Sequence, residues 1–179
     1  MPADVSGSAL AELKDWLGIS RPNEDDLLTG LLQASLEMCE AFTGQAPLLQ
    51  QVEERLPTQA GRYRLSSQPV ETILSVEAFA QDGTRSPLLP EQFETSFEAP
   101  GSVAVNLFAD TAADAIVVTL RSGLASEWSA LPPAIRQGAI RLCAHMFRDR
   151  DRDGYPGAGA VPPASVTALW RAWRTVRLT

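Results

Sequence analysis

The chain has 179 residues, of which 45% are apolar and 21% are charged, and its formal net charge is −7. These proportions are those of an ordinary globular domain, and they exclude a chain that is disordered along its whole length. No apolar run is long enough to cross a bilayer, and residues 1–18 lack the pattern of a secretory signal, so we expect a soluble protein that is made and stays in the cytoplasm.

Two helices are expected at the start of the chain. Ser8 can cap a short helix that runs to Leu17 and stops at Gly18, and Asn23 can cap a longer helix that ends at residues 43–44. The acidic residues that follow Asn23 are explained by the positive end of the helix dipole. The apolar residues with helical spacing are Leu10, Leu13, Trp16 and Leu17 in the first helix, and Leu27, Leu28, Leu31, Leu32, Leu36, Cys39 and Phe42 in the second.

The middle of the chain has the pattern of strands and turns. Short apolar segments between residues 50 and 121 are separated by prolines and glycines, which predicts a small antiparallel sheet of roughly five or six strands. The pair Asp82-Gly83 predicts a hairpin, because glycine accepts the positive φ that a tight turn requires. The sheet is therefore expected to be an insertion between helices.

Two more helices are expected after the strands. Leu131-Pro132-Pro133 opens the third, which ends near Asp149, and the fourth covers about residues 165–174. The glycine- and proline-rich residues 150–163 between them predict an exposed loop. The predicted fold class is α+β: an antiparallel bundle of about four helices with an inserted small antiparallel β-sheet. We expect a single domain over residues 1–179, with a helical core from 8–44 and 131–178 and a β insert at about 50–121.

Charge is distributed unevenly along the chain. Residues 1–60 carry a net charge of −7, residues 61–120 carry −5, and residues 121–179 carry +5. Ends of opposite charge can meet unlike surfaces or stack on a neighbouring copy, although plain solvated surface is an equally good explanation. Lys14 is the one lysine, so nearly every cation is a guanidinium suited to bidentate pairing. The overall acidity disfavours tight binding to duplex DNA.

The residues that could carry chemistry do not form a catalytic set, so no catalytic, cofactor or metal site is expected. Residues 149–154 begin like a calcium loop, but position 160 is alanine instead of the required glutamate, and arginines separate the carboxylates. Cys143 and His145 would point to different sides of a helix and cannot act as a nucleophile and its base. Both Cys39 and Cys143 fit buried, inert thiols.

The last segment has the composition of an interaction surface. Two indoles and three arginines within about ten residues are typical of interface hot spots. The alternative is that the tryptophans dock the last helix on its own core, and one indole can face inward while the other faces outward. The candidates for an interface with a partner are Trp170, Arg171, Trp173, Arg174 and Arg177.

Taken in order, these segments resemble the head-to-tail connector proteins of tailed phages. Each is a degenerate helix or strand pattern, and their order along most of the chain carries the resemblance. In the last segment Ala172 and Trp173 stand where the family more often has proline and tyrosine. The segments that carry the resemblance are residues 10–17, 23–28, 40–44, 69–76 with the hairpin at 82–83, 131–150 and 161–174.

The resemblance implies a head-completion adaptor, a non-enzymatic structural protein without cofactors. Such a subunit forms a ring, commonly of twelve copies, on the portal vertex of a bacteriophage or of a phage-derived gene transfer agent. Its expected partners are other copies of itself, the portal protein, which its C-terminal segment would engage, and a tail-side stopper or tail terminator protein. DNA would pass through the ring without specific binding. The expected location is the neck of the particle, after synthesis in a bacterial cytoplasm.

Two alternatives from other classes remain. A small DNA-binding regulator could use the arginine-rich third helix and C-terminal tail. An enzyme could hold a metal ion with Asp149, Asp151 and Asp153, although the arginines between them oppose that use.

Overall fold

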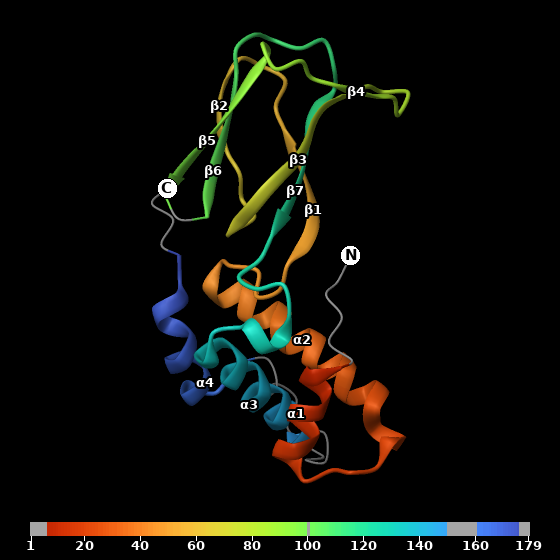
Figure 1. The fold of residues 1–179 in the computed structure, drawn as a ribbon, viewed down its shortest axis with the longest axis vertical. Helices are drawn as coiled ribbons and strands as arrows, with labels where there is room; N and C mark the ends of the chain where they lie inside the picture. Colours follow the sequence, from red (N-terminus) through yellow and green to blue (C-terminus); the bar gives the residue numbers. More distant parts are fainter. Residues whose placement is uncertain (1–6, 100, 150–160, 176–179) are drawn as a thin grey trace. The chain divides into compact units, whose positions relative to one another are not determined.

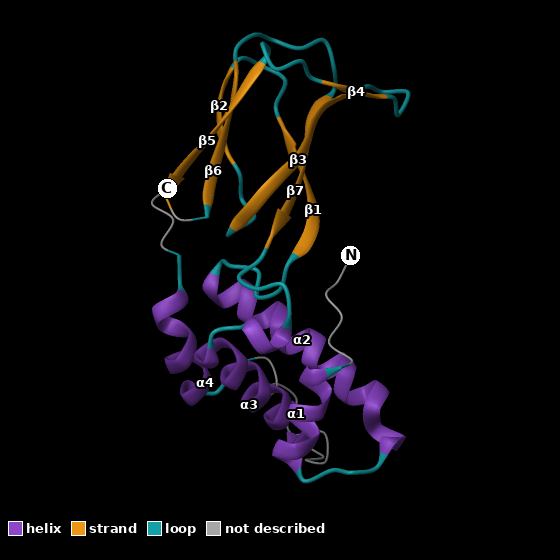
Figure 2. Cartoon of the chain, viewed as in Figure 1, coloured by secondary structure: helices purple, strands orange, loops and turns teal. Residues whose placement is uncertain are grey.

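Helices occupy both ends of the chain and strands occupy its middle, as the change in apolar spacing predicts (Figures 1 and 2). The computed structural model describes residues 7–99, 101–149 and 161–175. The chain divides into two compact units: residues 49–123, here called the β unit, and residues 2–48 with 124–179, here called the helical unit. The α+β class is confirmed. That the two units act as a single domain stays a prediction, as does the antiparallel arrangement of the bundle.

The helical unit contains four α-helices among its described residues. Gly18 and Gly44 follow the first two helices with φ of 70° and 73°, the left-handed conformation that ends a helix and that glycine adopts without strain. Their bounds are α1 (Ser8–Leu17), α2 (Asp25–Thr43), α3 (Pro133–Asp149) and α4 (Ala164–Trp170), with 3-10 turns η1 (Pro22–Glu24), η2 (Trp128–Ala130) and η4 (Arg171–Trp173).

The two predicted N-caps are wrong. Ser8 is already inside α1, whose N-cap is Gly7, and Asn23 lies in the 3-10 turn η1 before α2 begins. Pro22 at the start of η1 has the fixed φ of a helical turn, so the chain winds before the position that Asn23 was expected to cap. The acidic residues Asp25 and Asp26 do occupy the first turn of α2, where the helix dipole favours them.

One apolar core holds the helical unit together. Leu13 of α1, Leu28 and Leu32 of α2, and Ile135 and Leu142 of α3 are almost completely shielded from solvent. Trp16 departs from the prediction, because its side chain is 46% exposed although it shares the apolar spacing of α1. None of the described helices is both long and apolar enough to span a bilayer.

The last α-helix is locked into this core by one close contact. The Trp170 indole is completely buried, and its Nε1 donates a hydrogen bond to the carbonyl oxygen of Ile135 at 3.3 Å. It rests on the backbone of Gly138, where a Cβ atom would lie 2.1 Å from Trp170 Nε1. A glycine inside a helix costs up to about 1 kcal/mol relative to alanine. In α3 that cost is offset by the space it leaves for the indole.

The described residues of the β unit form seven strands in two sheets, not one sheet of five or six. Apolar spacing shows where strands lie but not which strands pair, and the turn at residues 57–60 takes the chain from one sheet to the other. Side chains from both sheets share one apolar core, as in a sandwich. The first sheet has the order β1 (Gln50–Leu56), β7 (Ala115–Ser122), β3 (Val70–Phe79), β4 (Arg85–Pro87), and the second has β2 (Gly61–Arg64), β6 (Ser102–Leu107), β5 (Phe93–Ala99).

The predicted hairpin at Asp82-Gly83 is confirmed. It joins β3 to β4, and Gly83 has a φ of 85°. The backbone N–H of Thr84 donates to Asp82 Oδ1 at 2.8 Å, which lowers the pKa of that carboxyl. The turn therefore combines the glycine conformation with an aspartate that bonds its own backbone two residues ahead.

A carboxylate of β1 anchors the loop that follows β2. Glu54 accepts backbone hydrogen bonds from Ser66 at 2.8 Å and from Ser67 at 2.6 Å. Partial burial alone would raise the pKa of Glu54, but these bonds outweigh it, and the pKa lies below its ordinary value.

Replacing Glu54 by glutamine tests that anchor. We expect Glu54→Gln to lower the free energy of unfolding by about 1 to 3 kcal/mol at pH 7, because two backbone donors lose a charged acceptor. A lowered pKa stabilises the fold above the unfolded value and loses that effect as the pH falls, so the difference should shrink near about pH 3. Urea unfolding at both pH values measures it, with the exposed Glu91→Gln as control. An equal loss at both pH values would contradict the charged acceptor.

The contact between Gly138 and Trp170 gives a second prediction. Gly138→Ala forces its methyl group into the indole, and overpacking of this kind costs about 1 to 3 kcal/mol or more. The matched control is Gly30→Ala in α2, where nothing lies within 4 Å of the new Cβ and a gain of up to about 1 kcal/mol is expected. Thermal unfolding of the two variants measures the contrast. Equal shifts in both would show that the indole moves aside freely.

Candidate functional site

The C-terminal segment after Trp170 is held on the helical unit by backbone hydrogen bonds. The Gln45 side-chain amide donates to the carbonyl oxygen of Trp173 in η4. The backbone N–H of Thr175 donates to the carbonyl oxygen of Thr43 at 2.8 Å, and the Thr175 hydroxyl donates to the same oxygen at 3.1 Å. The described end of the chain is therefore fastened to the last turn of α2.

The five interface candidates fall into different environments. Trp170 belongs to the core, where the alternative interpretation placed it, so its indole presents no surface to a partner. Trp173 is partly buried against the same core, while Arg171 and Arg174 are exposed. Arg177 lies outside the described residues. The role of Arg171, Trp173 and Arg174 in an interface stays a prediction.

Arg174 is oriented by an aromatic ring. Its guanidinium carbon lies 5.2 Å from the centre of the Phe42 ring, within the range of a cation–π contact. Phe42 in turn lies 6.1 Å from the Trp170 ring. The sequence placed Phe42 on the apolar face of its helix, but no spacing rule indicated that it would support an arginine from the other end of the chain.

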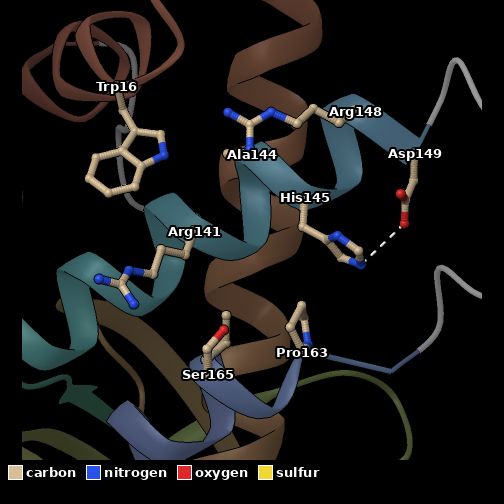
Figure 3. A pocket seen from close by; sticks show the side chains of 9 residues that line it. Trp16, Arg141, Ala144, His145, Arg148, Asp149, Pro163 and Ser165 are labelled. Carbon is tan, nitrogen blue, oxygen red and sulfur yellow. Dashed lines mark ion pairs between the residues drawn. The ribbon is translucent and has the colours of Figure 1, made fainter.

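A groove of about 460 Å³ lies between α1, α3 and the start of α4 (Figure 3). Arg141, His145 and Arg148 of α3 line it together with the exposed Trp16 of α1, whose ring lies 5.9 Å from the Arg141 guanidinium. His145 Nε2 pairs with Asp149 Oδ2 at 3.1 Å, as the dashed line in Figure 3 shows. Basic groups around an exposed indole can contact an anionic or aromatic group, and the sequence analysis did not predict this cluster.

The thiols lie where the sequence analysis expected them. Cys143 is buried in the helical core while His145 lines the groove, so the two side chains do not meet. Burial raises the pKa of both Cys39 and Cys143 to about 12. The described residues contain no group of three or more His, Cys, Asp or Glu side chains placed to hold a metal ion. Asp151, Asp153 and Gly154 lie outside the described residues.

Reaction with a thiol reagent tests the state of the cysteines. A thiol with a pKa near 12 has almost no thiolate at pH 8, and only the thiolate reacts. We expect neither cysteine to be labelled in the folded protein and both to be labelled in denaturant. Mass spectrometry after brief treatment at pH 8 counts the modified sites, and rapid labelling of the native chain would contradict the burial.

Comparison with known proteins finds similarity in fold. No family model matches the sequence, and no curated protein matches it. Among solved structures, a chain of the neck of an empty gene transfer agent (GTA) particle computed with C6 symmetry has a TM-score of 0.75 and 22% identity, covering 99% of this chain and 95% of that one. A chain of the native GTA virion has a TM-score of 0.76 and 22% identity, covering 100% and 95%. A chain of the native GTA neck computed with C12 symmetry has a TM-score of 0.75 and 24% identity, covering 99% and 94%. The chain therefore has the fold of these particle components along its whole length.

Proposed function

We propose that this protein is a structural component of the neck of a gene transfer agent or phage particle, where it acts as a head-to-tail adaptor. The observation that carries the proposal is the similarity in fold to neck and virion chains over 99–100% of this chain, which takes in both the helical unit and the β unit. A match of one unit alone would indicate only a common building block. The order of segments along the sequence supports the same conclusion independently.

In the proposed role the protein forms a ring of twelve copies on the portal vertex. The similar neck chains come from particles computed with C6 and C12 symmetry. A ring requires that one surface of each copy fits a different surface of the next, because a surface that pairs with itself produces a closed dimer. The other expected partners are the portal protein on the head side and a stopper or tail terminator on the tail side.

The proposed portal contact is the exposed part of the C-terminal segment. Arg171 and Arg174 present guanidinium groups, and Trp173 contributes the exposed part of its indole. Arginine and tryptophan are the residue types that most often dominate binding energy at protein interfaces. The hydrogen bonds with the Thr43 carbonyl oxygen and the Gln45 side-chain amide hold this segment in place before binding, which lowers the entropy cost of docking. The role requires no catalysis and no cofactor.

Charge reversal at the two exposed arginines tests the portal contact. We expect Arg171→Glu with Arg174→Glu to leave the fold intact and to give filled heads without tails in the producing host. Loss of an arginine that is an interface hot spot costs about 2 kcal/mol, roughly thirtyfold in Kd, and the loss is repeated at every copy in a ring. Electron microscopy of purified particles counts heads with and without tails.

The control is Arg21→Glu, which makes one such charge reversal at an exposed position before η1. Tailed particles should persist with this control. Normal tails with the double variant would remove the proposed portal contact. A chain that is absent from the necks of normal particles would remove the proposed function altogether.

A further inference from the structure

Both outer strands of the second sheet of the β unit have an edge with no partner strand in the described part of the chain. The order of this sheet is β2-β6-β5, so among the described residues β2 and β5 are each paired on one side only. In an antiparallel pair, every second residue bonds the neighbouring strand and the residues between them point away from it. The bonds from Leu65 N to Val103 O and from Phe108 N to Gln92 O show which residues bond β6 on each side. The N–H and C=O groups of Arg62 and Arg64 therefore point away from β6, at the outer edge of β2. Those of Phe93, Thr95 and Phe97 point outward from β5.

The two edges carry opposite charge. Arg62 and Arg64 lie on β2, while Glu94 and Glu98 lie on β5. Glu98 already attracts both arginines across β6, with Nε to carboxylate distances of 3.0 Å from Arg62 and 2.9 Å from Arg64. These bonds lower the pKa of Glu98, and the bond from Arg64 has the larger effect. The arginine side chains are still 59% and 65% exposed, so they remain accessible to a second acidic edge.

An uncovered aromatic ring lies on the acidic edge. Phe97 is opposite Val103, on the side of the sheet that faces the core, yet the residue is 64% exposed while Val103 is completely buried. Its neighbour on that side, Thr95, is exposed as well. The core of the β unit reaches Phe93 at the start of β5 but does not cover Thr95 and Phe97, and a strand added beside β5 would cover the Phe97 ring.

We propose that the β5 edge of one copy binds the β2 edge of the next copy, so that the three-stranded sheets join head to tail around the ring. The inference rests on the proposed function, because that function requires a ring, and it names the surfaces that form it. Both β2 and β5 run antiparallel to β6, so they run in the same direction as each other. A small rotation between neighbouring copies preserves that direction, and the new pair is parallel.

Charge selects this pairing over its alternatives. Two β2 edges would bring arginines together, and two β5 edges would bring glutamates together, so each edge repels a copy of itself. Only the mixed pair is attractive. Since each copy has one edge of each kind, the contact cannot be completed within a dimer and continues until the ring closes.

Proline substitutions at outward-pointing positions test the pairing. Thr95→Pro removes an N–H that points away from β6, and Arg64→Pro does the same on β2, so neither breaks a bond within the sheet. The matched controls are Thr95→Ala and Arg64→Lys, which keep the N–H groups, and the lysine also keeps the positive charge of the β2 edge. Thermal unfolding of each variant checks that the chain folds. Phe97→Lys is a second variant of the β5 edge that needs no proline.

Light scattering of the purified full-length variants gives one readout. The two proline variants, mixed in equal amounts, should form a heterodimer and nothing larger, because the mixture retains one intact β5 edge and one intact β2 edge that can meet. Each variant alone should stay monomeric. A mixture that forms no heterodimer, or a single proline variant that assembles as its matched control does, would overturn the pairing.

Particles from the producing host give the other readout. We expect Thr95→Pro, Arg64→Pro and Phe97→Lys each to reduce the amount of this chain in purified necks at least tenfold relative to the Thr95→Ala and Arg64→Lys controls. Proline variants that enter necks as the controls do would overturn the inference and leave the adaptor function standing. Absence of the unaltered chain from necks would overturn the function instead, and the heterodimer assay would then decide the pairing alone.

Discussion

The Trp170 indole packs directly against the backbone of Gly138, and the position of the C-terminal segment depends on this contact. Because no Cβ separates α3 from the ring, α4 lies close enough for Trp170 Nε1 to reach the Ile135 carbonyl oxygen. This position carries η4 to the end of α2, where Thr43 and Gln45 bond its backbone. Arg171 and Arg174 thus project from a fixed platform, which is what a preorganised docking surface requires.

The helical unit is built from two distant parts of the chain, and short hydrogen bonds close it where the β unit is inserted. Leu124 N donates to Ala46 O at 2.9 Å and Ala125 N donates to Pro47 O at 3.2 Å, so the chain leaves and returns at neighbouring points. An insertion whose ends are already close adds little strain to the core that receives it. Each unit can consequently have its own apolar core and its own binding surface.

The two units present different kinds of surface for the proposed ring. The helical unit offers exposed arginines beside an aromatic support, suited to a larger partner. The second sheet of the β unit offers two strand edges of opposite charge that have no partner strand among the described residues, suited to a copy of itself. Backbone pairing is directional and repeats identically in every copy, whereas side-chain docking can accommodate a partner of different symmetry.

Apolar spacing, glycine stops and the Asp-Gly turn were sufficient to place the four helices, the inserted strands, the β3–β4 hairpin and the buried thiols, because these features depend on residues close in sequence. Cap positions failed at Ser8 and Asn23, because α1 begins at Ser8 itself and the chain already winds at Pro22 before α2. The division into two sheets, the exposure of Trp16, the burial of Trp170 on Gly138 and the groove around His145 arise only in the folded chain. Each of them depends on which distant segments meet, and local periodicity carries no information about such pairings.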